Sequence, residues 1–167
     1  MSYLLRVVVL SLGIATFPAL AQLQIEITRG IDNPTPIAVV PFGWSGPGAS
    51  PEDVARIIDS DLARSGQFSP VSRRDMLSYP TRGSEIYFRD WRAINSDYVL
   101  IGRYELAAEG NLRLNWQLFD SAREQSMDGG VITGAASEVR MLAHKIADEV
   151  YETLTGIPGA FATRLLY

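Results

Sequence analysis

Hydrophobic residues are distributed unevenly along this chain, and the most compact apolar run lies at residues 37–42 (Ile-Ala-Val-Val-Pro-Phe). The run does not alternate with polar residues, so it predicts a strand that is covered on both faces in the middle of a sheet. Pro41 has no N–H group to donate, and we expect regular pairing to end there. The next residues, 43–48 (Gly-Trp-Ser-Gly-Pro-Gly), predict a turn-rich loop rather than helix or strand.

Two segments have the spacing of amphipathic helices. The first is expected to begin with Ser50 as cap and Pro51 at its first position, and to end at Gly66. Its apolar face is formed by Val54, Ile57, Ile58 and Leu62. The second ends at Gly156 and carries an apolar stripe of Val139, Leu142, Ile146, Val150 and Leu154. A short helix from Asp90 to Ile94 is also expected.

Several further segments have the composition of strands, and Gly, Pro and Asn residues separate them. Residues 22–29 and 112–119 alternate between apolar and polar positions, which predicts half-buried strands. Shorter strands are expected at residues 67–71, 98–102 and 131–133, with hairpin turns at 110–111 and 128–130. Segment 72–89 mixes Pro, Gly and charges and predicts loop with short turns.

These elements predict an α+β sandwich. Two amphipathic helices pack on one face of a mixed sheet of five to six strands.

The first 21 residues have the features of a secretory signal peptide. An apolar run follows Arg6, and small residues at Ala19 and Ala21 suit a signal peptidase. We therefore expect cleavage between Ala21 and Gln22, export from the cytoplasm, and no membrane insertion after cleavage. The alternative is a retained N-terminal anchor, but the apolar segment is short for a membrane span.

Composition narrows the possible partners. Among 167 residues there are 15 Lys and Arg, 19 Asp and Glu, and no cysteine, so disulfides are excluded. No block of basic residues occurs, which argues against nucleic acid and acidic lipid as partners.

The loop at 43–48 follows a central strand, a position where α/β proteins often bind ligands. A phosphate site needs free backbone N–H groups and usually a lysine. Pro47 and Pro51 remove two donors and no lysine is near, so a structural loop is favoured, with Trp44 packed or presented to a partner. The alternative of a periplasmic small-ligand-binding or enzymatic domain, using Ser45 and Ser50, stays open.

The sequence offers little evidence for catalysis, a metal or a cofactor. His144 is the single histidine, and its place on the flank of the last helix predicts a surface residue. The adjacent pair Asp148 and Glu149 points in divergent directions. These two, with Asp59, Asp61 and Asp97, are interpreted as solvated residues or caps. We predict no catalytic residues, no metal site, no cofactor and no enzyme activity.

The alternating segment 22–29 is the candidate binding element. It lies at the predicted mature N-terminus, and Gly30, Pro34 and Pro36 separate it from the central strand. It can be an edge strand of the domain's own sheet, or a strand lent to another protein by strand addition. The residues involved are Gln22, Leu23, Gln24, Ile25, Glu26, Ile27, Thr28 and Arg29.

Several separated stretches resemble the N-terminal domain of the TolB family of the Tol-Pal system. They include residues 36–42 (Pro-Ile-Ala-Val-Val-Pro-Phe), 46–48 (Gly-Pro-Gly), 97–102 (Asp-Tyr-Val-Leu-Ile-Gly) and 115–120 (Asn-Trp-Gln-Leu-Phe-Asp). The most specific is the closing stretch 154–161 (Leu-Thr-Gly-Ile-Pro-Gly-Ala-Phe).

This resemblance implies a fold like that of anticodon-binding domains and the role of a non-enzymatic adaptor. Family members bridge the inner-membrane protein TolA and the outer-membrane lipoprotein Pal, and they support envelope integrity and constriction at division. The family's TolA-binding strand corresponds to residues 22–29, within an N-terminal segment and linker at 22–36. The α+β domain corresponds to 37–156, and 157–167 to a linker and the start of a C-terminal β-propeller, which carries the Pal-binding surface and is absent from this chain.

Overall fold

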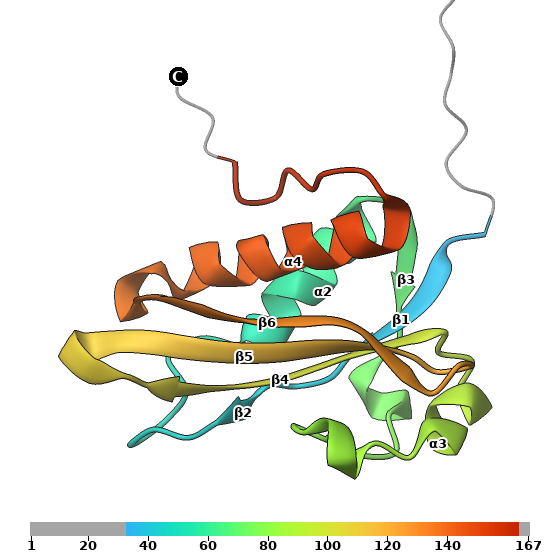
Figure 1. The fold of residues 1–167 in the computed structure, drawn as a ribbon, viewed down its shortest axis with the longest axis horizontal. Coiled ribbons are helices and arrows are strands. Elements are labelled where there is room, and N and C mark those ends of the chain that lie inside the picture. The colour runs from blue at the N-terminus through green and yellow to red at the C-terminus, as the bar shows by residue number, and fades with distance from the viewer. Residues whose placement is uncertain (1–32, 164–167) are drawn as a thin grey trace, which may run out of the picture.

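The computed structural model describes residues 33–163. Its elements follow one another in the order drawn in Figure 1. The strands are β1 (Thr35–Val39), β2 (Gly43–Trp44), β3 (Phe68–Pro70), β4 (Tyr98–Leu106), β5 (Asn111–Asp120) and β6 (Gln125–Ala135). The helices are α2 (Val54–Arg64), α3 (Phe88–Ala93) and α4 (Val139–Thr155). Short 3-10 turns lie at Arg73–Asp75, Gly83–Glu85, Ala108–Gly110 and Ala136–Glu138.

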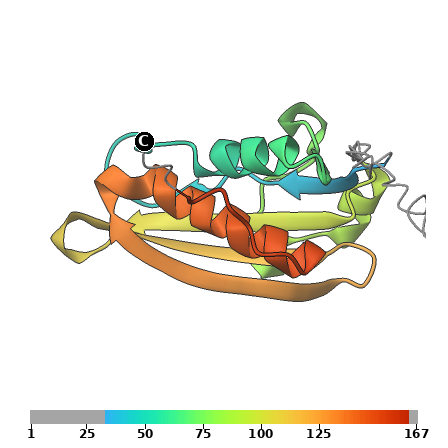
Figure 2. The same ribbon diagram turned by 90° about the horizontal axis from the view of Figure 1, so that it is seen from above.

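The strands form one mixed sheet in the order β3-β1-β4-β5-β6, and β2 pairs with the far end of β4. Pairing is parallel around β1 and antiparallel from β4 through β6. Helices α2 and α4 lie side by side on one face of this sheet (Figures 1 and 2). The predicted fold class, two amphipathic helices on one face of a mixed sheet of five to six strands, is therefore confirmed.

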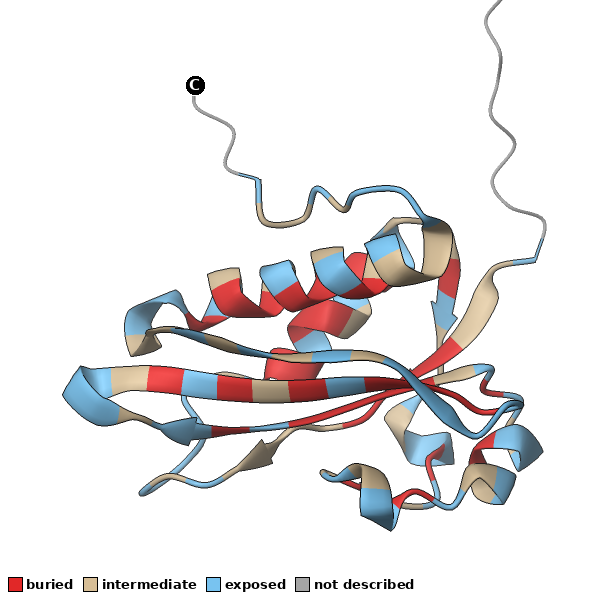
Figure 3. Ribbon diagram, in the orientation of Figure 1, coloured by how far each residue is buried: buried red, intermediate tan, exposed pale blue. Residues whose placement is uncertain are grey.

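The main core lies between the sheet and these two helices. In β5, Leu112, Leu114, Trp116 and Leu118 are buried in it, and the residues between them point the other way. Figure 3 shows this alternation as bands of colour along β5. The predicted apolar stripes of α2 and α4 face the same core, as the 3.6-residue spacing requires. Gly102 lies under the Phe42 ring, where a Cβ atom would stand 2.3 Å from it.

A second, smaller core lies on the opposite face of the sheet. There, Trp91 from α3 and Met76 and Ile86 from the segment before it cover Ile101 and Phe119. The burial of β1 on both faces follows from these two cores, since Ala38 and Val40 face this side while Ile37 and Val39 face the helices. The segment 72–89 is mostly irregular, as predicted, and it contributes part of this cover.

Two boundaries near the Gly-rich segment differ from the sequence-based expectation. Gly43 and Trp44 form a short strand, β2, that pairs in parallel with Arg103 and Tyr104. Pro41 interrupts pairing only briefly, because Val40 still donates to Leu100 and Ser45 donates to Tyr104. Helix α2 begins after Asp53, whose side chain accepts a hydrogen bond from the N–H of Arg56, and not after Ser50.

Two other boundaries were also predicted wrongly. Residues 128–130 lie inside β6, and the hairpin turn is at 121–124, where the Asp120 carboxylate accepts the N–H groups of Ala122 and Arg123. Helix α3 begins at Phe88, so Asp90 is in its first turn instead of capping it. The predicted helix ends are confirmed, since Gly66 and Gly156 both have positive φ angles.

Candidate functional site

The predicted binding strand, Gln22 to Arg29, and the predicted cleavage position between Ala21 and Gln22 lie outside the described residues. The structure does describe how the chain enters the domain after this segment. The N–H of Thr35 donates to the carbonyl of Gln67 at 2.9 Å, and the N–H of Asp97 donates to the carbonyl of Pro36 at 3.1 Å. The entry to β1 is therefore fixed between its two neighbouring segments of the sheet.

A small hollow lies beside this entry point. Its volume is about 240 Å³, and its walls come from the start of β1 and β3 and the end of α4. The lining residues are Thr35, Gln67, Phe68, Tyr98, Leu154, Thr155 and Ile157.

The loop at 43–48 uses its side chains for internal contacts. The indole Nε1–H of Trp44 donates to the carbonyl of Gly48 at 3.2 Å, and the Trp44 ring packs on Tyr104 with centroids 5.0 Å apart. The Ser50 hydroxyl contacts the Tyr104 hydroxyl, and both donate to the carbonyl of Glu52. Burial raises the pKa of Tyr104. Trp44 thus packs within the domain, which favours the structural interpretation of this loop over a ligand site.

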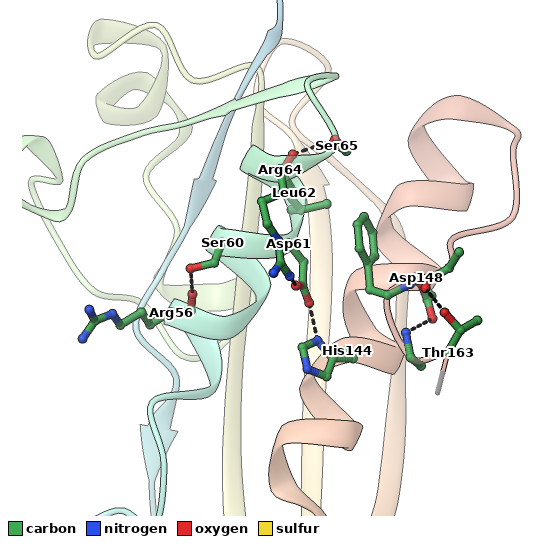
Figure 4. Close-up of polar contacts among 12 residues, drawn as sticks. Arg56, Ser60, Asp61, Leu62, Arg64, Ser65, His144, Asp148 and Thr163 are labelled. Atoms are coloured by element: carbon green, nitrogen blue, oxygen red, sulfur yellow. Dashed lines mark hydrogen bonds and ion pairs between the residues drawn. The ribbon is translucent and has the colours of Figure 1, made fainter. Parts of the chain in front are cut away.

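A groove between α2 and α4 has a volume of about 490 Å³ and is lined mainly by charged residues. In its wall, the carboxylate of Asp61 is fully buried and accepts the Nδ1–H of His144 at 2.5 Å (Figure 4). Arg64 forms an ion pair with the same carboxylate. At the mouth of the groove, Arg140 pairs with Glu52 at 2.7 Å.

This arrangement corrects two predictions. His144 was predicted to lie on the surface, but its side chain is only 22% exposed and is directed at Asp61. Asp61 was predicted to be a solvated residue or a cap, but it is buried within α2. The burial of Asp61 could be predicted from a helical wheel, because Asp61 lies three positions after Ile58 and four after Ile57 and therefore shares their apolar face. The pair joins α2 to α4, and the imidazole of His144 together with the guanidinium of Arg64 provides partners for the buried carboxylate.

Asp148 was also predicted to be solvated or a cap, and the structure gives it a specific role. Its two carboxylate oxygens accept the N–H groups of Phe161 at 2.7 Å and Ala162 at 3.1 Å (Figure 4). The neighbouring Glu149 is largely exposed, and partial desolvation together with the carboxylates of Asp128 and Asp148 raises its pKa. Asp59 has a raised pKa because it is partly desolvated.

Two further features bear on the kind of site this domain can have. Within residues 33–163, no helix has the length and apolar character needed to cross a membrane. Across the same residues, His, Asp and Glu side chains do not gather in groups of three suited to binding a metal ion.

Sequence comparison identifies the family. A family model described as the TolB amino-terminal domain matches residues 23–127. A protein named Tol-Pal system protein TolB from Pseudomonas fluorescens Pf-5 is 44% identical over 153 residues, which are 92% of this chain and 35% of that protein. The protein of the same name from Pseudomonas aeruginosa PAO1 is 42% identical over the whole chain and 38% of its own length. The chain thus spans about a third of these relatives.

Structural comparison agrees. The crystal structure of TolB from Acinetobacter baumannii matches with a TM-score of 0.68 and 31% identity, over 82% of this chain and 32% of that one. The C-terminal domain of LpoB from Salmonella enterica shares the fold, with a TM-score of 0.51 and 16% identity, over 64% of this chain and 86% of that one. From the matched residues and the fold together, this chain belongs to the TolB family, of which it carries the amino-terminal domain.

Proposed function

We propose that this chain acts in the Tol-Pal system as the partner-binding domain of a non-enzymatic periplasmic adaptor. The observation that carries the proposal is the 44% identity, over 92% of the chain, to a protein named as a component of that system. In this role the domain supports outer-membrane integrity and constriction during division. Residues 1–21 direct export, and the mature chain begins at Gln22.

The proposed partner is the C-terminal domain of TolA, bound through Gln22 to Arg29. An extended segment adds to a sheet edge through main-chain hydrogen bonds, and its alternate side chains enter apolar positions of the partner. Leu23, Ile25 and Ile27 occupy alternate positions and supply that apolar side. Gly30 and Pro34 separate the segment from β1, so it can pair with a partner without disturbing the domain's own sheet.

The attachment of this segment supports the same role. Thr35 and Pro36 are hydrogen-bonded to neighbouring chain segments, and β1 continues into the buried centre of the sheet. A partner bound upstream would therefore be linked to the buried centre of the sheet. In the longer family members, Pal is proposed to bind through the C-terminal β-propeller, which follows this domain in the chain.

The test is calorimetric titration of the TolA C-terminal domain with the chain beginning at Gln22. Moderate affinity is expected because the interface is small. Changing Leu23, Ile25 and Ile27 together to Thr is expected to weaken binding at least about tenfold, which corresponds to about 1.4 kcal/mol.

The matched control changes Gln24 and Glu26 to Thr on the other side of the same segment, and circular dichroism verifies that each variant is folded. Deletion of residues 22–29 is expected to abolish binding. Unchanged affinity after that deletion would refute strand addition by this segment.

A further inference from the structure

Within residues 33–163, β6 is the outermost strand on one side of the sheet and pairs only with β5. It is 11 residues long and contains neither proline nor lysine, two residues that commonly protect sheet edges. The opposite edge is different, because β3 has only three residues and one is Pro70. The domain therefore has one long sheet edge and one short, interrupted edge.

The direction of the outward backbone groups on β6 follows from Gly129, whose own N–H is bonded to a side chain. This N–H donates to the side chain of the preceding residue, Asp128, at 2.7 Å, and so points away from β5. Backbone groups alternate in direction along an antiparallel strand, so those of Val131 and Thr133 also point away from β5. Both residues are exposed. Among residues 33–163, no other backbone segment bonds to this edge.

One face beside this edge is hollowed, and Val131 presents an exposed apolar side chain there. Val131 is 50% exposed and lies opposite Asn115, on the side of the sheet away from α2 and α4. Met127, on the same strand, is 40% exposed. A shallow hollow of about 380 Å³ adjoins Val131, and its lining also includes the polar side chains of Arg103, Asn115 and Gln117.

The helix side of the edge is negatively charged. Asp128 accepts the hydroxyl of Thr153 in α4 at 2.7 Å, which places its carboxylate on this side. Glu149 is close enough for Asp128 and Asp148 to raise its pKa, and Lys145 counteracts this only in part. No ion pair involving Asp128 or Glu149 occurs in the described part of the chain.

From these features we infer that the β6 edge at residues 129–133 accepts an extended strand of a partner protein, with apolar side chains on one face and Lys or Arg on the other. The apolar side chains would cover Val131, and the cationic ones would face Asp128 and Glu149. This is a second surface, separate from the segment at 22–29. That segment is a poor match for the edge, since its polar side carries Glu26.

The probe is a synthetic nine-residue peptide that alternates valine with lysine or threonine, added to the chain beginning at Gln22. In ¹H–¹⁵N correlation spectra, we expect the amide resonances of Gly129, Val131 and Thr133 to shift more than those of residues in β3. Replacing lysine by glutamate in the peptide is expected to weaken binding about fivefold to tenfold. Peptide N-methylated on alternate amides is expected not to bind, because strand pairing needs those donors.

Protein variants complete the test. Glu149→Lys is expected to weaken binding of the lysine peptide and to strengthen binding of the glutamate peptide. Glu152→Lys, one turn away on α4, is the matched control and is expected to change both affinities less. Val131→Pro removes an outward donor and is expected to abolish binding. If that variant does not fold, the N-methylated peptide gives the same test on the intact chain.

Four results would overturn the inference. The first is equal binding of the N-methylated peptide, and the second is a set of resonance shifts centred away from β6. The third is a gain in affinity after deletion of residues 22–29, which would mean that the chain's own segment occupies the edge. A dependence of the shifts on protein concentration alone would assign the edge to a second copy of this chain and would also overturn it.

Discussion

At the scale of single residues, Asp61 is the most consequential charge in the described domain. Its side chain is 1% exposed, and it is balanced by His144 from α4 and by Arg64 from its own helix. A buried carboxylate is tolerated only where such partners compensate it. Removing a partner and removing the carboxylate itself should therefore have unequal effects on stability.

We expect His144→Ala to lower the free energy of unfolding by about 2–3 kcal/mol, because it leaves the carboxylate buried with Arg64 alone. Asp61→Leu removes the buried charge and is expected to cost about 1 kcal/mol or less. Urea denaturation at pH 7 measures both changes, and Lys145→Ala, at an exposed neighbouring position, is the control. A larger loss for Asp61→Leu than for His144→Ala would contradict this account.

At the scale of elements, the start of α2 depends on a pair of charged residues from separate segments. Asp53 caps the helix, and Arg73 donates to both of its carboxylate oxygens, at 2.7 and 2.8 Å. The hydrogen bond from Arg73 is the largest influence that lowers the pKa of Asp53, and it outweighs partial burial. A lowered pKa in the folded state means that stability is gained above the unfolded value and lost as pH falls through the folded value.

Arg73→Gln is expected to reduce the free energy of unfolding at pH 7 by about 0.5–1 kcal/mol, because both side chains are partly exposed. The difference from the unmodified chain should shrink as pH falls below about 4, where Asp53 becomes protonated in the unfolded chain. Urea denaturation between pH 3 and pH 7 measures this, with Arg74→Gln as the neighbouring control. A difference that stays constant over this range would exclude the ion pair as its cause.

Periodicity located the principal helices and the central strand, because burial of one face requires a repeating pattern. It failed where a short-range contact decided the boundary. The Asp-Gly-Gly sequence at 128–130 resembles a hairpin turn, but the Asp120 side chain turns the chain earlier and leaves those residues in β6. Similarly, the two residues of β2 are a strand only because β4 continues alongside them.

At the scale of the whole molecule, sequence patterns pointed to a binding segment at 22–29 but could not specify surfaces built from several elements. The exposed edge of β6 depends on the strand order, and the Asp61–His144 pair depends on the crossing of α2 and α4. Both require positions distant in sequence to be adjacent in space. The stretch 154–161 carries the most specific family resemblance, and the contacts of Asp148 with the backbone at 161–162 give this stretch a structural role.

Residues 157–163 were expected to be a linker, and in the structure they pack along α4. Gly159 lies so close to Asp148 that an added Cβ atom would be 2.4 Å from a carboxylate oxygen. The Phe161 ring meets Tyr151 edge to face, with centroids 5.7 Å apart, and Tyr151 meets Phe68 at 6.0 Å. These contacts fix the direction of the chain as it passes from α4 toward residue 163.

Asp148→Ala is expected to release this segment while leaving the rest of the domain folded. The variant removes the acceptor for two backbone N–H groups, each bond to a charged group contributing about 1.5–3 kcal/mol. We therefore expect hydrogen exchange at Phe161 and Ala162 to accelerate at least about tenfold, while exchange in β5 changes little. Glu149→Ala is the control, because its side chain accepts no backbone N–H. Unchanged exchange at Phe161 would show that the aromatic contacts with Tyr151 hold the segment without Asp148.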